Sequence, residues 1–75
     1  MTQNGNYRTT RSFLMTEACK AFFVGDKFVI TGVDKWKCNV SYVNDTTGKR
    51  IVETKKVNRN RLAELQMMRC FEEVK

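Results

Sequence analysis

A strict alternation of apolar and polar residues marks the middle of this sequence. In residues 35–42, KWKCNVSY, aromatic, thiol and aliphatic side chains take every second position, with Lys, Asn and Ser between them. Successive side chains of a β-strand point to opposite faces of its sheet, so this pattern predicts a strand with one apolar and one polar face. Even a two-stranded hairpin is unstable alone in water. The rest of the chain must therefore supply partner strands and a layer that covers the sheet.

Two further segments have the composition of strands. Residues 27–31, KFVIT, and residues 49–57, KRIVETKKV, contain many β-branched or aromatic side chains and show no helical spacing. Residues 44–48, NDTTG, have the composition of a hairpin loop, with Gly48 placed for a left-handed conformation. The sequence therefore predicts antiparallel strands joined by a five-residue loop.

A loop of that length predicts a strand pairing in which two aromatic residues lie next to basic residues. The pairs are Trp36 near Lys55 or Lys56, and Tyr42 near Lys49 or Arg50. Such an arrangement suits single-stranded nucleic acid, because rings stack on bases while Lys and Arg contact phosphates. In the alternative interpretation this apolar face is the core face of the sheet, and Lys35, Lys37 and Lys55 stay on the solvent side. Both interpretations leave a basic stripe on the hairpin.

Helices are predicted on either side of these strands. A short N-terminal helix is predicted within residues 9–23, with residues 16–23 as its core, Thr16 as its N-cap and Gly25 as the stop that follows. A C-terminal helix is predicted from the good helix formers RLAELQMM, capped by Asn58 or Asn60. The residues after it, RCFEEV, either continue the helix or form a final edge strand.

The length of 75 residues predicts one domain, because the apolar side chains can fill one modest core. Residues 1–8 are polar and show no periodicity, so they are expected to form a flexible N-terminal tail. Residues 9–75 are expected to form a single small α+β domain. Its predicted parts are a short N-terminal helix, a small antiparallel sheet or partly open barrel, and a C-terminal helix.

The strand segments also carry a family resemblance. VGDKFVITGV, KWKCNVSYV and RIVETKKV, with a glycine-containing turn before the last, resemble the strands of small SH3-like barrels. The resemblance covers residues 24–57 and does not include the glycine-marked loop of KOW-type nucleic-acid binders. Barrels of this kind occur in ribosome-associated and phage-encoded accessory proteins. The resemblance implies an SH3-like barrel and an accessory role, in the host cytoplasm if the protein is phage-encoded.

The sequence contains no histidine, the side chain that most readily activates a nucleophile or relays protons at neutral pH. Its three cysteines lack CxxC spacing and its four glycines are scattered, so neither a zinc knuckle nor a phosphate-binding loop is indicated. No apolar run approaches the roughly 20 residues that span a bilayer. We therefore expect a cytoplasmic protein with reduced thiols and no membrane contact, and we expect no catalytic residues, cofactor or metal.

The positive charge is concentrated in one part of the chain. Residues 49–61 hold six basic residues and one acidic residue, and so carry five of the six net positive charges. Arg59 and Arg61 lie at the start of the predicted helix, where the helix dipole disfavours cations. A bound phosphate would offset this, because helix N-termini present free N–H groups to anions. Lysines that solvate an edge strand are the plainer explanation of the same charges.

We hypothesise a small non-enzymatic nucleic-acid-binding accessory protein whose basic hairpin and helix N-terminus contact phosphates of single-stranded or duplex nucleic acid. The alternative is a phage-type modulator or inhibitor that binds a host protein, such as a nuclease or polymerase, through the same basic surface. A small assembly subunit is the third hypothesis, and an exposed sheet edge also allows a homodimer. In the first two hypotheses the same residues make the contact: Lys35, Trp36, Lys37, Tyr42, Lys49, Arg50, Lys55, Lys56, Arg59 and Arg61.

Overall fold

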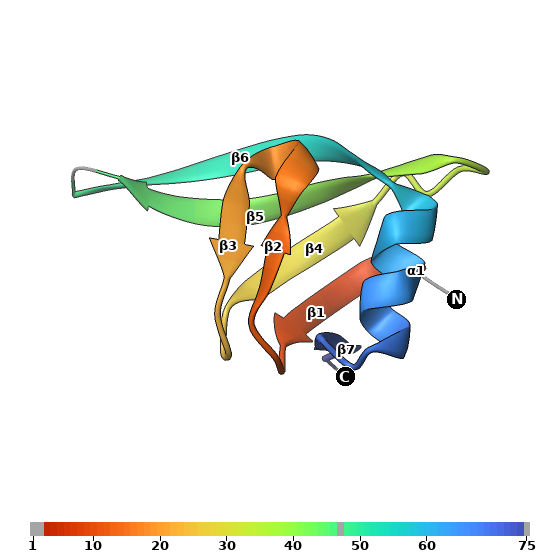
Figure 1. The fold of residues 1–75 in the computed structure, drawn as a ribbon. Helices are drawn as coiled ribbons and strands as arrows, with labels where there is room; N and C mark the ends of the chain where they lie inside the picture. Colours follow the sequence, from red (N-terminus) through yellow and green to blue (C-terminus); the bar gives the residue numbers. More distant parts are fainter. Residues whose placement is uncertain (1–2, 47, 75) are drawn as a thin grey trace.

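Strands dominate the computed structural model, which describes residues 3–46 and 48–74 (Figure 1). In chain order the elements are β1 (Gly5–Thr9), β2 (Phe13–Met15), the 3-10 turn η1 (Thr16–Ala18), β3 (Lys20–Phe22), β4 (Lys27–Thr31), β5 (Lys37–Thr46), β6 (Lys49–Asn58), α1 (Arg59–Met67) and β7 (Phe71–Glu73). Five strands form an antiparallel sheet in the order β6-β5-β4-β1-β7, and β2 pairs with β3 in a separate hairpin.

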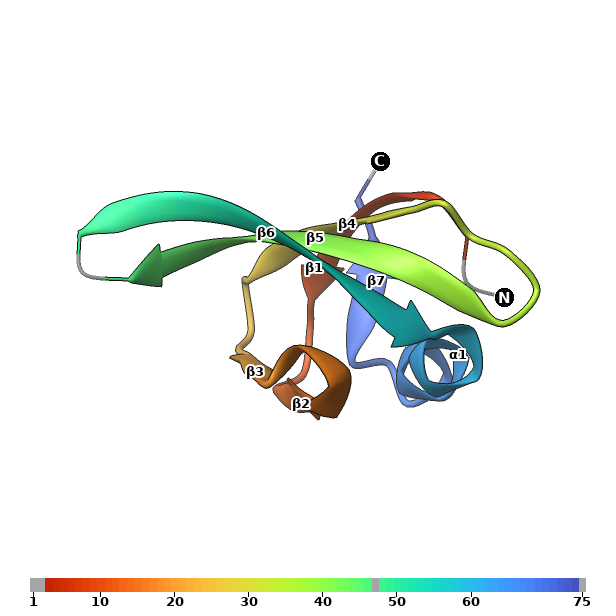
Figure 2. The same ribbon diagram turned by 90° about the horizontal axis from the view of Figure 1, so that it is seen from above.

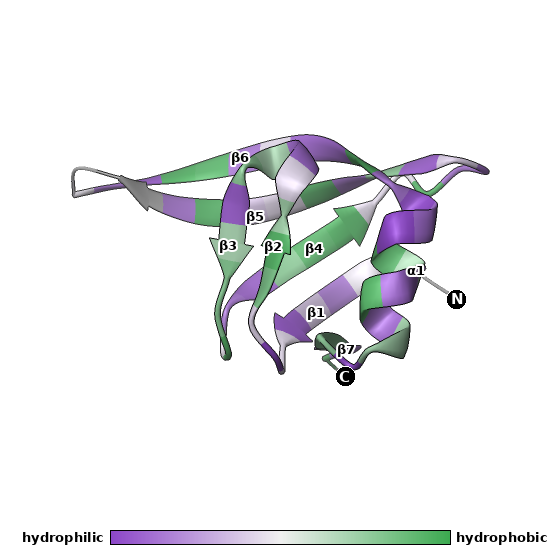
Figure 3. Ribbon diagram, in the orientation of Figure 1, coloured by the Kyte–Doolittle hydropathy of each residue, from purple (hydrophilic) through white to green (hydrophobic). Residues whose placement is uncertain are grey.

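The five-stranded sheet is covered on one face only. Figure 2 shows the β2–β3 hairpin, η1 and α1 together on the same side of the sheet. No element of the described ranges lies over the opposite face, which we call the open face. In Figure 3 β2 and β4 are mostly hydrophobic in colour, whereas β6 has both colours and α1 begins with a hydrophilic turn. The molecule is therefore a two-layer structure with its core between the layers.

Aromatic side chains fill the centre of that core. The ring of Phe28 on β4 lies edge-on to Phe22 on β3 and to Phe71 on β7, with ring centroids 5.2 Å apart in both pairs. Phe22 also meets Tyr42 of β5 edge-on at 5.4 Å. Edge-to-face contacts at these distances are favourable beyond the area they bury. Through its ring Phe22 thus ties the small hairpin to the main sheet.

The predicted α+β class and the SH3-like barrel are both wrong. Only one α-helix, α1, forms in the part of the chain that the structure describes, and most of that part is strand. The sheet does not close into a barrel, because β6 and β7 each have a neighbour on one side only. The structure is instead a mainly antiparallel β-fold with a single C-terminal helix.

The predicted N-terminal helix is replaced by a turn between two short strands. After η1, Cys19 adopts a left-handed conformation with φ of 50°, and the chain turns back as β3. A two-residue period then replaces the helical one, since Met15 and Phe22 are buried while Leu14 and Ala21 are exposed. The apolar spacing of this segment fits either period over so few residues. Packing against the core, which the sequence alone does not show, favours the strands.

The predicted N-terminal tail also differs from the structure. Residues 5–8 lie in β1, which pairs with β4 on one side and with β7 on the other. The Tyr7 side chain is buried, and its hydroxyl donates a hydrogen bond to the carbonyl oxygen of Gln3 at 2.6 Å. Residues 1–2 lie outside the described ranges. Because β1 is mostly polar and buries a single aromatic ring, its sequence does not alternate between apolar and polar residues. The strand therefore could not be recognised from the sequence.

The three central strands and the C-terminal helix are confirmed by β4, β5, β6 and α1. Of the two alternatives for RCFEEV, the edge strand forms, as β7. The predicted register of the hairpin is wrong, because only two residues connect β5 to β6 and Tyr42 lies opposite Glu53. Gly48, with φ of 75°, adopts the left-handed conformation expected of it, while Thr47 lies outside the described residues. The shorter connection moves the pairing by three or four residues.

Candidate nucleic-acid interface

The register of β5 and β6 decides which face each predicted binding residue occupies. Cys38, Val40 and Tyr42 lie on the covered face and are buried, so the core interpretation of this apolar face is correct for them. The Tyr42 hydroxyl donates to Glu53 Oε2 at 3.1 Å, and burial raises the pKa of this phenol. Its ring is only 3% exposed and already packs against Phe22, so it offers no surface for stacking on a base.

Trp36 is exposed, unlike Cys38, Val40 and Tyr42, the other apolar residues of the alternating pattern. It precedes the first residue of β5, and its side chain is 64% exposed. Four cationic residues surround it in the sequence or across the ladder, and we call the set the Trp36 corner. Its members are Lys35, Trp36, Lys37, Lys56 and Arg59.

The backbone of the Trp36 corner is held by a network around Asp34. The Asp34 carboxylate accepts hydrogen bonds from the backbone N–H groups of Trp36, at 2.8 Å, and Lys37, at 2.7 Å. Arg59 closes the loop from the helix side, because its backbone N–H donates to the Trp36 carbonyl at 2.9 Å and its guanidinium to the Asp34 carbonyl at 2.8 Å. Trp36 is therefore presented from a loop with fixed backbone geometry.

The lysines of the corner lie close to Trp36 or on the open face beside it. Lys35 Nζ lies 5.2 Å from the centroid of the Trp36 ring system, within cation–π range. Lys37 lies opposite Asn58, and Lys56 lies opposite Asn39, so the two lysines are diagonal neighbours on the open face. Within residues 3–46 and 48–74, no ion pair joins Lys35, Lys37 or Lys56 to a carboxylate.

The carboxylate of Asp34, next to the corner, accepts hydrogen bonds from the backbone. Hydrogen bonds from the Lys37 and Trp36 N–H groups lower the pKa of Asp34, and the nearby charges of Lys56 and Arg59 lower it further. Asp34 thus stays ionised at neutral pH and organises the loop. The corner has the chemistry that a nucleotide requires, with a ring for stacking and cations for phosphate.

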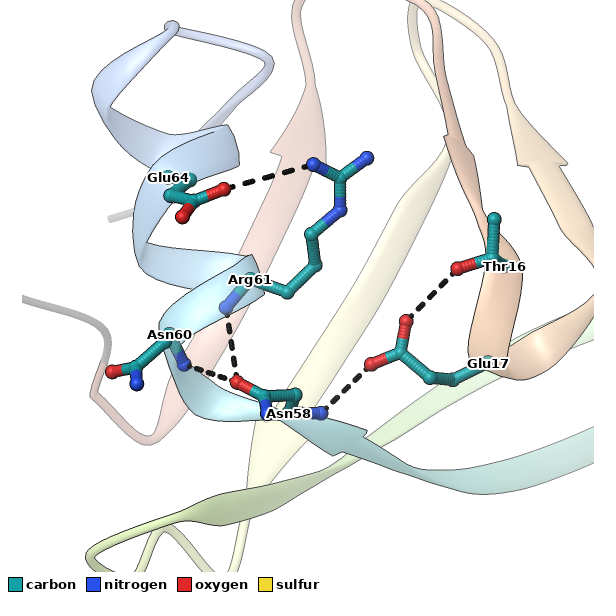
Figure 4. A network of polar contacts seen from close by, with 6 residues as sticks. All are labelled: Thr16, Glu17, Asn58, Asn60, Arg61 and Glu64. Atoms are coloured by element: carbon teal, nitrogen blue, oxygen red, sulfur yellow. Dashed lines mark hydrogen bonds and ion pairs between the residues drawn. The ribbon is translucent and has the colours of Figure 1, made fainter.

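The helix N-terminus does not have the free donors that the sequence suggested. Figure 4 shows Asn58 capping α1, with its side-chain oxygen accepting from the N–H groups of Asn60 and Arg61 at 2.8 and 3.2 Å. The N–H of Asn58 itself donates to Glu17 Oε2 at 2.9 Å. This hydrogen bond is the main reason that the pKa of Glu17 is lowered. The carboxylate of Glu17 therefore lies at the helix N-terminus, where the sequence predicts a bound phosphate.

The positive charge of Arg61 is also balanced by carboxylates of the protein. Its guanidinium lies 3.7 Å from the carboxylate of Glu64, one turn along the helix, and its charge also lowers the pKa of Glu17 (Figure 4). The cost of an arginine in the first helical turn is thus offset by two glutamates. Arg61 does not belong to the Trp36 corner.

The other predicted residues lie apart from the corner. Lys49 and Arg50 begin β6 at the hairpin tip, seven and six residues before Lys56. At about 3.3 Å per residue, Lys49 is on the order of 23 Å from Lys56 along the strand. Lys55 lies opposite Val40 and so is on the covered face. The structure gathers half of the predicted residues and separates Tyr42, Lys49, Arg50, Lys55 and Arg61 from them.

Two features of this region were missed in the sequence. Asp34 was not singled out, although an Asp followed by residues whose N–H groups it caps is a common turn signature. The second feature is a hollow of about 450 Å³ on the open face, where Val29, Val43, Val52 and Val74 meet beside Lys27. Its valines come from three strands and from the residue that follows β7, so only the sheet order brings them together.

In comparisons with known proteins, no family model, curated sequence or solved structure matched this chain. Among the described residues, no helix is both long and apolar enough to cross a membrane. The same residues contain no group of three His, Cys, Asp or Glu side chains arranged to hold a metal ion.

Proposed function

We propose that this protein is a small nucleic-acid-binding accessory protein that contacts a single strand through the Trp36 corner. The observation that supports this most directly is the exposed indole of Trp36, held on an ordered loop among four cationic residues. An exposed tryptophan on a flexible segment would need no explanation. A tryptophan whose backbone is fixed by Asp34 and Arg59 is organised for contact.

The proposed contact combines two interactions. Stacking of one base on Trp36 contributes about 1–3 kcal/mol, independent of the identity of the base. Lys35, Lys37, Lys56 and Arg59 contact the flanking phosphates and release counterions. Four such contacts on a single strand give a slope of log K against log salt of about −3. Binding is therefore weak in sequence preference and strongly dependent on salt.

The edge of the sheet gives the strand a path. Lys37 and Lys56 lie on the open face next to the hollow lined by Val29 and Val43, so the backbone of a bound strand runs from Trp36 across this face. Free thiols at all three cysteines support a cytoplasmic location for this function.

Trp36 is the only tryptophan in the chain, so its fluorescence reports on the proposed site without a label. We would titrate the protein with single-stranded and duplex oligonucleotides at two salt concentrations and follow tryptophan quenching together with anisotropy of labelled oligonucleotide. We expect quenching by single strands, weaker quenching by duplex, and loss of binding at high salt.

The Lys37→Glu/Lys56→Glu variant should lose at least tenfold in affinity. The matched control is Lys49→Glu/Lys55→Glu, which makes the same change of net charge outside the corner. Equal loss in both variants would mean that net charge, and not the Trp36 corner, determines binding. No binding of either oligonucleotide at low salt would contradict the proposal and favour an acidic protein partner.

A further inference from the structure

We propose that the outer edge of β6 binds an extended segment of another protein, with acidic residues at both ends and apolar residues in its centre, as a sixth strand of the sheet. This site does not depend on the proposed nucleic-acid interface, although the two share Lys56 and adjoin the same hollow. It follows from the direction of the β6 backbone groups, the order of its side chains and the position of β6 in the sheet.

The direction of the backbone is set by Asn58. Asn58 lies opposite Lys37 in the ladder between β5 and β6. Its N–H nevertheless points away from β5 and donates to Glu17. N–H groups alternate in direction along a strand, so those of Val52, Thr54 and Lys56 also point away from β5. Within the described chain, none of these three N–H groups has a hydrogen-bond partner. They form a row of donors at the edge of the sheet.

The order of side chains along β6 defines the partner. Cations stand in pairs near both ends, as Lys49-Arg50 and Lys55-Lys56, and residues 51–54, IVET, lie between them. Of these four, Glu53 lies opposite Tyr42 and accepts from its hydroxyl. The side chains of Ile51 and Val52 are 49% and 69% exposed and point to opposite faces. Cations alone would serve to protect an edge from aggregation, but exposed Ile and Val on both faces would not. A strand with an apolar centre and acidic ends complements the two cation pairs and the exposed Ile51 and Val52.

The open face adds a place for one side chain of such a partner. Val52 lies opposite Val43 and both line the hollow on that face. A strand added beyond β6 directs alternate side chains over Val52, so an apolar residue at its centre extends this hollow. Specificity would come from that contact and affinity from the main-chain hydrogen bonds.

A second copy of this chain fits the same edge poorly. Two β6 strands paired antiparallel about Glu53 place Arg50 opposite Lys56, and pairing about Val52 places Lys49 opposite Lys55. A parallel, in-register pair places each cation beside its own copy. Like charges directly opposite each other are destabilising in a sheet. The homodimer expected from an exposed edge is therefore not the occupant that we propose.

The test uses the whole chain and the synthetic peptide Glu-Asp-Val-Thr-Val-Thr-Asp-Glu. We would record amide hydrogen exchange by NMR with and without excess peptide. The N–H groups of Val52, Thr54 and Lys56 should exchange at least tenfold more slowly when the peptide is bound. A peptide in which every acidic residue is replaced by Lys should give no slowing. Absence of binding by the acidic peptide, or binding that leaves these three amides unchanged, would overturn the proposal.

Thr54→Pro is the matching variant, because proline removes one donor that points outward and leaves the backbone hydrogen bonds to β5 in place. Both Thr54→Pro and Thr54→Ala lose the side-chain hydrogen bond to Ser41, so the pair isolates the backbone donor. It should weaken peptide binding at least tenfold, whereas Thr54→Ala should retain it. Circular dichroism shows whether the variant folds. If it does not, Lys49→Glu/Lys55→Glu tests the charges, and unchanged peptide binding in that variant would overturn the proposal. The proposal would also be overturned if an oligonucleotide, and not the peptide, protected the three amides from exchange. The edge of β6 would then be a nucleic-acid-binding site.

Discussion

The two faces of the sheet are built from alternating residues of the same strands, yet they differ in what holds them. On the covered face Phe28, Val40 and Tyr42 are all buried against the β2–β3 hairpin and α1. On the open face their neighbours Val29, Ser41 and Val43 have no covering layer in the described chain. The comparison teaches that the stability of the fold depends on one face, which leaves the other free to carry binding residues.

The largest contrast is expected between two adjacent phenylalanines. Phe22 is fully buried in the aromatic core and Phe23 is 61% exposed. Phe22→Ala should lower the free energy of unfolding by about 3–5 kcal/mol, through lost burial and a residual cavity. Phe23→Ala should change it by no more than about 0.5 kcal/mol. Urea unfolding followed by circular dichroism measures both, and a comparable loss in the two variants would contradict the two-layer description.

Trp36→Ala should separate binding from stability. Loss of the stacking surface is expected to weaken single-strand binding by about 1–3 kcal/mol, that is, by roughly five- to 150-fold. The free energy of unfolding should hardly change, because the indole is mostly exposed. Anisotropy and urea unfolding provide the two readouts, and Trp36→Phe should restore part of the affinity. Unchanged affinity in Trp36→Ala would show that the ring does not stack on the ligand.

Asn58→Ala should have an intermediate effect on stability. The Asn58 side chain accepts from two N–H groups of the first helical turn, and its loss should destabilise the protein by about 0.5–2 kcal/mol. Asn58→Ser keeps a capping oxygen and is the matched control. Thermal unfolding of both variants measures the difference, and equal melting temperatures would mean that the cap is dispensable.

The smallest effect is expected from the titration of Glu17. The hydrogen bond from Asn58 lowers its pKa in the folded state below the ordinary value of 4.5. A carboxylate with a lowered pKa stabilises the folded state above the ordinary value, and this contribution is lost as the pH falls through the folded pKa. Glu17→Gln should therefore be less stable at pH 7, with the difference from wild type shrinking below about pH 4.5. A difference that is the same at pH 7 and pH 3 would argue against this role.

The sequence predicted the parts of the fold whose pattern is local. The alternation through Cys38, Val40 and Tyr42 located β5 and its buried face, and Asn58 was one of two predicted caps for α1. Over residues 16–23 a few apolar residues fit both a helix and a strand, and burial of Phe22 against residues distant in sequence decides between them. β1 could not be detected, because its neighbours come from β4 and β7.

For the candidate site, the sequence identified the residue types but not their grouping. Basic residues on β6 alternate between faces, so a charge run that is continuous in sequence divides into separate sets in the sheet. The N-terminal arginines of α1 suggested a phosphate, but Glu17 approaches from a turn that is distant in sequence. Such long-range partners have no local signature.

The place of β1 between β4 and β7 has a consequence for how the chain folds. Tyr7 lies opposite Phe28 on one side and opposite Glu73 on the other, so the first strand of the sheet also depends on the last. A nascent chain can form the β4–β5–β6 meander early, but β1 stays an edge strand until residues 71–73 have been synthesised. Contacts of such long sequence separation slow folding, because loop closure must precede them. Completion of the sheet is thus a late event that follows translation of nearly all of this sequence.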